Sequence, residues 1–116
     1  MEVKSWEQLE QLGAGGGLRG KIVFYNRPMD PTRIRTFEAS SGASRAAKHG
    51  AVAVLVRSMT TKIDNFPHTG ALRYDSTYAL IPAAAISTQA AEDLSRLLHA
   101  EGAATVTMRL NCRTLP

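Results

Sequence analysis

Four short apolar runs, rich in β-branched or small residues, are spaced along the chain and separated by polar or glycine-rich segments. They cover Lys21–Asn26, Ala51–Ser58, Leu80–Ser87 and Ala104–Leu110. The second run is apolar almost throughout, which predicts a central strand covered on both faces. The last run alternates apolar and polar residues, which predicts a strand with one face in water.

Three other segments show the period of amphipathic helices. The first begins at Ser5, which with Gln8 has the spacing of a capping box. The second, Gly42–Gly50, places alanines on one face and ends at a glycine that suits the left-handed position after a helix. The third starts at the Ser-Thr pair 87–88, either of which can cap it, and stops at Gly102.

The glycine-rich segment before the first strand, "GAGGGLRGK", matches two phosphate-binding patterns. Both patterns, G-x-x-x-x-G-K and G-x-G-x-x-G, work only after a strand and before a helix. Here the predicted helix precedes the glycines and the strand follows them, and Ile22 stands where a magnesium-binding Ser or Thr belongs. We therefore interpret the segment as a helix-to-strand linker, with Gly13 at the left-handed position after the helix.

The order of these elements favours parallel crossovers, because strands and helices alternate with short joints. The sequence thus predicts one small α/β domain over 1–116, with a helix and glycine linker over 1–20 and a core over 21–116. Two stretches without clear periodicity remain, Arg27–Ser41 and Met59–Ala79. Long loops are functional or contain hidden strands, and "ALRYDSTYAL" in the second stretch predicts a hairpin.

Composition narrows the classes of function. Hydrophobic residues make up 44% and charged residues 21% of the 116-residue chain, as in soluble globular domains. No apolar run has the length of a membrane span, and no signal peptide is recognised at the N-terminus. The net charge is +4, but only 6% of the residues are aromatic, so basic patches interleaved with aromatics are not expected. We expect neither a nucleic-acid nor a membrane partner.

Candidate catalytic and metal-binding residues are sparse. A single cysteine, Cys112, excludes an internal disulfide, and we interpret it as a half-buried thiol. The three histidines, His49, His68 and His99, are far apart and form no H-E-x-x-H, so no zinc site is expected in this chain. His49 and His99 come near predicted helix C-termini, where the helix dipole favours a cation.

The segment "FPHTG" is the main candidate for function. His68, Thr69 and Gly70 lie in it without helical or strand periodicity. One interpretation is a pair of side chains presented to a ligand or a neighbouring domain. The other is a turn whose polar side chains satisfy local backbone groups. Arg57 is a second candidate, since it ends the central strand, where sites of α/β proteins form.

Four segments together resemble a protease-associated domain. They are "RGKIVFYNRPM", "GASRAAKHGAVAVLVRSMT", "FPHTGALRY" and "IPAAAIS". The resemblance covers nearly the whole chain. It is to the version of the domain inserted in secreted zinc aminopeptidases and carboxypeptidases, including those like plasma glutamate carboxypeptidase. One departure is "TFEASSGAS", which is shorter than the corresponding segment of related sequences and puts a substrate contact there in doubt.

This resemblance implies a swivelling β/β/α fold, a small mixed sheet or open β-barrel flanked by helices. It also implies a non-catalytic role, in which the domain shapes substrate access beside a catalytic domain that holds zinc. The expected partners are that catalytic domain and peptide substrates, and the expected location is extracellular, periplasmic or lysosomal. His68, Thr69, Gly70 and Arg57 are the residues we expect at the contact. The alternative is a free-standing module that binds a protein or peptide.

Overall fold

Four parallel strands form the sheet of the computed structural model, which describes residues 1–27, 38–68 and 74–110, with only the backbone for 38–41. In spatial order they are β1 (Glu2–Val3), β2 (Ile22–Tyr25), β3 (Ala53–Arg57) and β4 (Ala83–Ile86). The α/β class and the parallel connections are confirmed. The pairs between described residues are all parallel, so the mixed sheet implied by the resemblance is not seen in this part of the chain.

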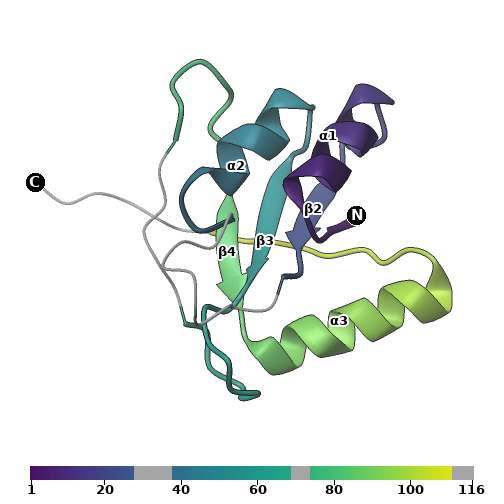
Figure 1. Ribbon diagram of the computed structural model, residues 1–116, viewed down its shortest axis with the longest axis vertical. Helices are drawn as coiled ribbons and strands as arrows, with labels where there is room; N and C mark the ends of the chain where they lie inside the picture. Colours follow the sequence, from purple (N-terminus) through teal and green to yellow (C-terminus); the bar gives the residue numbers. More distant parts are fainter. Residues whose placement is uncertain (28–37, 69–73, 111–116) are drawn as a thin grey trace, which may run out of the picture.

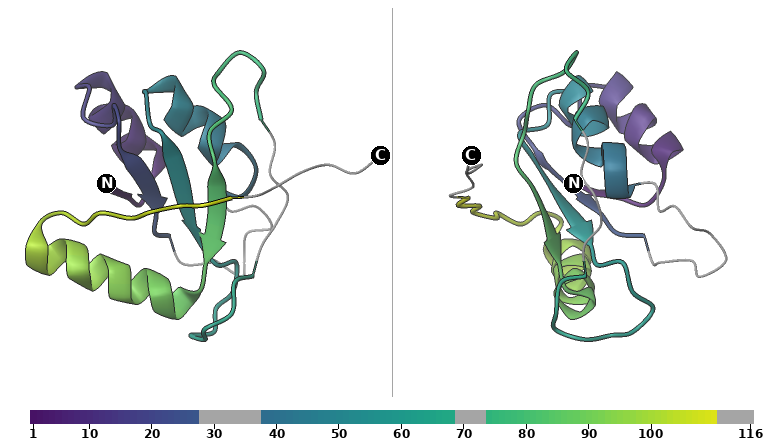
Figure 2. Two further views of the ribbon diagram at one scale, coloured as in Figure 1. Left: turned by 180° about the vertical axis from the view of Figure 1, so that it is seen from behind. Right: turned by 90° about the vertical axis from the view of Figure 1, so that its left-hand side faces the viewer.

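Three helices cover the sheet, two on one face and one on the other (Figures 1 and 2). α1 (Trp6–Ala14) and α2 (Glu38–Lys48) lie side by side on one face, and α3 (Thr88–Glu101) lies on the opposite face. Two of the expected caps are confirmed. The side chain of Ser5 accepts from the Gln8 N–H, and that of Ser87 accepts from the Ala90 N–H.

Alternation along the strands divides the core between the two faces. The first face packs against α1 and α2, and its largest fully buried side chains are Val3, Leu9, Leu18, Val23, Tyr25 and Val54. The second face packs against α3 and the segment 104–110. Phe24, Leu55 and Ala91 are buried there, whereas Ile22, Leu94, Leu98, Val106 and Met108 are only partly buried. The hydrophobic side chains of the first face are therefore more completely buried than those of the second.

Glycines allow the helices to approach the first face closely. A Cβ on Gly42 of α2 would come within 2.9 Å of the Tyr25 ring, whose hydroxyl donates to the Gly42 carbonyl at 2.7 Å. A Cβ on Gly13 of α1 would overlap the ring of His49, just after α2. The prediction that Gly13 adopts the left-handed conformation was wrong: α1 continues past it, and the glycine serves to make room for the His49 ring.

Three further predictions were wrong. The run Ala104–Leu110 forms no strand; it is an extended segment whose Val106 and Met108 pack on the second face without joining the sheet. The second helix starts at Glu38 instead of Gly42. The described part of the expected hairpin, residues 74–80, holds a turn and no strand. Conversely, β1 was not predicted, since two residues are too few to show a periodicity.

The helix–glycine–strand order of the N-terminal region is confirmed, with Gly16 and Gly20 at positive φ between α1 and β2. Gly50 and Gly102 end their helices at positive φ, as predicted. Within the described ranges, no helix is long and apolar enough to cross a membrane. Thr69, Gly70 and Cys112 lie outside the described residues.

Candidate functional site

Polar side chains gather at the carboxyl end of the sheet, on the face covered by α3. The Arg57 Nη1 at the end of β3 donates to Asn26 Oδ1 at 3.1 Å and to Glu92 Oε1 of α3 at 2.6 Å. The Asn26 amide in turn donates to Glu2 Oε2 at 2.6 Å. This arginine cluster, which consists of Glu2, Asn26, Arg57 and Glu92, ties three neighbouring strands to α3.

Burial limits what Arg57 can do directly. The residue is only 6% exposed, and its Nε is the one buried side-chain nitrogen or oxygen without a hydrogen-bond partner among the described residues. A buried cation is stable only where its charge is paired, and Glu92 supplies that charge. The observed contacts of Arg57 therefore hold α3 against the central strand.

The loop that follows β3, residues 59–68, is closed at its base by hydrogen bonds. The Met59 N–H donates to the His68 carbonyl at 2.9 Å, and the His68 N–H donates to Ser58 Oγ at 2.8 Å. Ser58 is almost fully buried, and its hydroxyl donates to the carbonyl of Ile86 in β4 at 2.8 Å. The two ends of the loop are thus fixed to the ends of β3 and β4.

A second set of bonds fixes the far half of this loop to the first turn of α3. The Thr88 hydroxyl accepts from the Asp64 N–H and donates to the Lys62 carbonyl, both at 2.9 Å. The Gln89 N–H donates to the Asp64 carbonyl at 3.1 Å. Because Thr88 is fully buried, these bonds are shielded from water. The 59–68 loop is accordingly ordered, although it projects beyond the sheet (Figures 1 and 2).

A histidine–aspartate pair lies at the end of this loop. His68 Nε2 is 3.0 Å from Asp64 Oδ2, and the His68 side chain is 43% exposed. The N–H of Phe66, and after it the His68 imidazole, lower the pKa of Asp64, so this carboxyl stays ionised to lower pH than usual. An ionised carboxylate fixes the orientation of the imidazole and leaves its other nitrogen for an external partner.

Of the expected site residues, the structure places His68 on the surface and Arg57 below it, both at the carboxyl end of the sheet. The two are connected through the chain, because Ser58 follows Arg57 and binds the His68 N–H. Sequence reasoning missed Asp64 and Thr88, which shape the loop. The four-residue spacing of Asp64 and His68 was the available signal for the pair.

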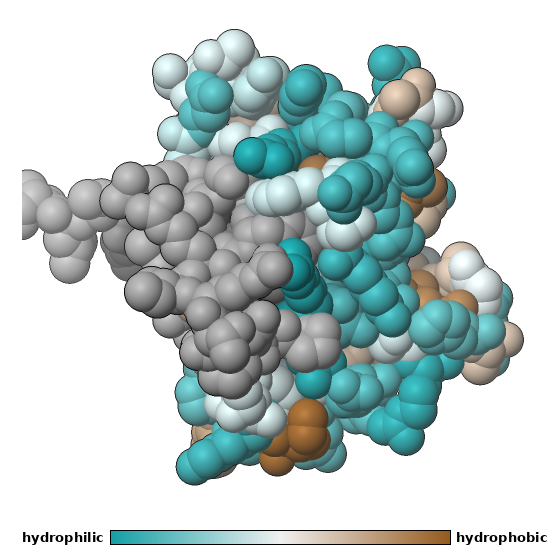
Figure 3. All heavy atoms as spheres, in the orientation of Figure 1, coloured by the Kyte–Doolittle hydropathy of each residue, from teal (hydrophilic) through white to brown (hydrophobic). Residues whose placement is uncertain are grey.

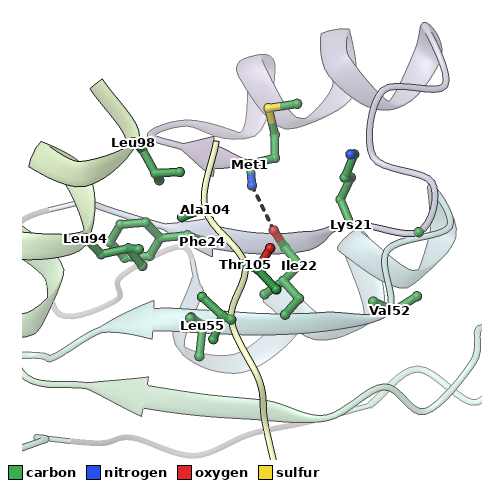
Figure 4. A pocket seen from close by; sticks show the side chains of 12 residues that line it. Met1, Lys21, Ile22, Phe24, Val52, Leu55, Leu94, Leu98, Ala104 and Thr105 are labelled. Atoms are coloured by element: carbon green, nitrogen blue, oxygen red, sulfur yellow. Dashed lines mark hydrogen bonds between the residues drawn. The ribbon is translucent and has the colours of Figure 1, made fainter. Parts of the chain in front are cut away.

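A separate apolar pocket of about 350 Å³ opens near the amino ends of β2 and β3, on the face of the sheet that α3 covers (Figure 4). Side chains of Phe24, Leu55, Leu94 and Leu98 line it together with residues 104–106. At its mouth the Met1 amino group donates to the Ile22 carbonyl at 2.9 Å. Burial, and after it the charge of Lys21, lower the pKa of this amine.

The three histidines lie apart, each beside a single carboxylate. His49 Nε2 is 2.9 Å from Glu10, and His99 Nε2 is 3.8 Å from Glu2. In the described ranges, His, Cys, Asp and Glu form no group of three or more that could hold a metal ion. A pair of ligands falls short of the three or four that zinc needs.

Comparison with solved structures points to a class of peptidases. The crystal structure of a peptidase M28 precursor from Shewanella amazonensis matches with a TM-score of 0.76 and 32% identity, over 87% of this chain and 24% of that one. No family model matches the chain.

Among curated proteins, the chain is similar to carboxypeptidase Q. The proteins of Bos taurus and Homo sapiens are each 32% identical over 114 residues, which are 98% of this chain and 24% of theirs. The carboxypeptidase Q of Xenopus laevis is 44% identical over 79 residues, which are 68% of this chain and 17% of the Xenopus protein. The chain thus spans about a quarter of the length of the first curated relatives it matches. It corresponds to one segment of a peptidase.

Proposed function

We propose that the chain is a protease-associated domain that shapes substrate access in a carboxypeptidase Q-like zinc exopeptidase, without catalysing the reaction itself. The observation that supports this most is the extent of the similarity. Nearly the whole chain aligns with a quarter of carboxypeptidase Q, and about a quarter of an M28 peptidase structure has a similar fold. A unit with its own sheet, helices and core fits an inserted domain.

The catalytic zinc belongs, in this proposal, to another domain of the parent protein. The residues that the structure describes do not fit a catalytic zinc site, because each histidine has one carboxylate beside it and none belongs to a group of three or more possible ligands. The family resemblance implies that the metal ligands lie outside the aligned segment. It also suggests an extracellular, periplasmic or lysosomal location.

The 59–68 loop is the part we assign to contact with the catalytic domain or the peptide. His68 is exposed on it and oriented by Asp64, and Thr69 and Gly70 continue the same segment. Arg57 supports this contact from below as a positioning residue, since its ion pair holds α3, to which the loop is bound. An ordered loop needs no further ordering when it meets its partner, which favours a precise fit.

A segment exchange tests the proposal. This chain replaces the aligned segment of human carboxypeptidase Q, and a second chimera receives only residues 58–70. Hydrolysis of several dipeptides is measured for both chimeras and for the chain alone. We expect the chimeras to turn over dipeptides with changed KM ratios, and the chain alone to show no turnover with or without zinc. Turnover by the chain alone, or unchanged KM ratios in both active chimeras, would refute the proposal.

The role of His68 is tested in the active chimera by His68→Ala, with His99→Ala as the matched control on an exposed histidine of α3. We expect kcat/KM to fall about tenfold for some dipeptides, mainly through KM, because binding is lost and not chemistry. The control should leave kcat/KM unchanged. Equal kcat/KM values for both variants with all dipeptides would show that the loop has no role in substrate access.

A further inference from the structure

The 59–68 loop carries two of the most exposed large hydrophobic side chains in the described ranges. Phe66 is 70% and Ile63 63% exposed, and only Leu80, at 72%, is comparable. A hydrophobic patch is visible among hydrophilic atoms at the lower end of the molecule, where this loop lies (Figure 3). Scattered exposed hydrophobics are ordinary, but these two lie three positions apart on one short loop.

Hydrogen bonds at and beside Ile63 and Phe66 hold the backbone of this part of the loop. The Phe66 N–H donates to Asp64 Oδ1 at 3.1 Å, and the Phe66 carbonyl lies 3.4 Å from Ser58 Oγ. Ile63 lies between Lys62 and Asp64, whose backbone groups bind Thr88. The chain therefore orders this loop and yet leaves its two largest apolar side chains in water, where they contribute nothing to the core.

We propose that Ile63 and Phe66 are the anchor by which this domain docks onto the peptidase domain of the same protein. The inference rests on the proposed function, and it names the two side chains of the loop that make the contact. An aromatic and an aliphatic side chain at the centre, with polar groups around them, is the composition of an interface hot spot. Lys62, Asp64 and Asn65 supply that polar rim.

The shape of the loop favours a folded domain over a peptide as the occupant. Peptides and small molecules bind in concave sites, whereas this loop projects from the carboxyl end of the sheet (Figure 1). A projecting pair of hydrophobic side chains fits an apolar depression in a larger surface. The relatives are about four times as long as this chain, so most of such a protein lies outside it and is tethered to it. Tethering makes even a small contact effective.

Thiol labelling tests the docking. Phe66→Cys and, as a matched control, Leu80→Cys are each introduced with Cys112→Ser into this chain and into the human carboxypeptidase Q chimera. Alkylation of the introduced thiol is followed by mass spectrometry. We expect the thiol of the Phe66→Cys variant to react at least tenfold more slowly in the chimera than in the chain alone, because docking covers it. The thiol of the Leu80→Cys variant should react at similar rates in both proteins.

Three results would overturn the docking proposal. The first is equal reactivity of the Phe66→Cys thiol in the chain and in a chimera that turns over dipeptides, which leaves the proposed function intact. The second is slow labelling of this thiol in the chain alone that speeds up on dilution, which assigns the surface to a second copy. The third is protection only on addition of dipeptide, which assigns the surface to substrate. An inactive chimera in which the thiol is protected would instead count against the proposed function alone.

Discussion

The two faces of the sheet are closed to very different degrees. On the face toward α1 and α2, six large side chains are fully buried and glycines bring the helices close. On the face toward α3, three residues of the hydrophobic cluster are buried, and the others are partly open around a pocket of about 350 Å³. α3 crosses only part of this face, and the segment 104–110 lies along another part without joining the sheet (Figure 2).

This difference teaches that the closest packing and the arginine cluster lie on opposite faces of one small sheet. The first face supplies the close packing that gives a unique fold. The α3 face carries instead the arginine cluster and the bonds that order the 59–68 loop. The same type of substitution should therefore lower the free energy of unfolding by different amounts on the two faces.

The largest expected effect compares two Leu→Ala changes on helices that face opposite sides. Leu9 of α1 is fully buried, whereas Leu94 of α3 is partly exposed. Leu9→Ala should lower the free energy of unfolding by about 3 kcal/mol and Leu94→Ala by about 1 kcal/mol, because the cost follows the buried volume lost. Urea unfolding measures both. Equal losses would contradict the difference in packing between the faces.

A smaller effect on stability is expected at Gly13, where α1 lies close to the His49 ring. Gly13→Ala places a methyl group in the space of the His49 ring, which must turn away and leave its partner Glu10. We expect a loss of about 2 kcal/mol from overpacking. Gly15→Ala is the control, since its nearest neighbour, the Leu12 carbonyl, would be 3.8 Å from the new Cβ. Thermal unfolding should show that control unchanged or slightly more stable.

The smallest effect is the pH dependence of the arginine cluster on the α3 face. Burial alone would raise the pKa of Glu2, but hydrogen bonds from Asn26 and Ser95 outweigh it and leave the pKa below the ordinary 4.5. A carboxyl with a lowered pKa in the folded state stabilises the fold above its ordinary pKa. That contribution is lost as the pH falls through the folded value.

Glu2→Gln should therefore flatten the loss of stability that the unmodified chain shows as the pH falls below about 4.5. Urea midpoints measured from about pH 6 to about pH 3 follow this effect. Glu101→Gln, at the exposed end of α3, is the matched control and should keep the original profile. A Glu2→Gln profile that matches this control would show that the cluster does not couple to the fold.

Much of the fold could be predicted because its signals are local. β2, β3 and β4 lie within the apolar runs, and the caps at Ser5 and Ser87 are set by neighbouring backbone groups. The error at Ala104–Leu110 has a different origin. Alternation predicts which side chains turn inward, and Val106 and Met108 do so, but it does not provide a neighbouring strand to pair with.

The candidate site was less predictable, because its bonds join residues far apart in the sequence. His68 and Arg57 were recognised from their neighbours in the sequence, and their roles in contact remain proposals. Asp64 is ordered by Thr88, which lies 24 positions away, so no window of the sequence holds both. Phe66 stood in the segment "FPHTG", but its exposure depends on which groups surround it in space.

The pairing of β1 with β2 continues to the very first residue. The Met1 amino group donates to the Ile22 carbonyl, and the Met1 carbonyl accepts from the Phe24 N–H, each at 2.9 Å. Any residue joined to that nitrogen would extend the open edge of the sheet, and by alternation its side chain would point to the same face as Glu2. The one residue of a purification tag that adjoins Met1 would therefore join the strand: valine there would lengthen it, and proline would end it.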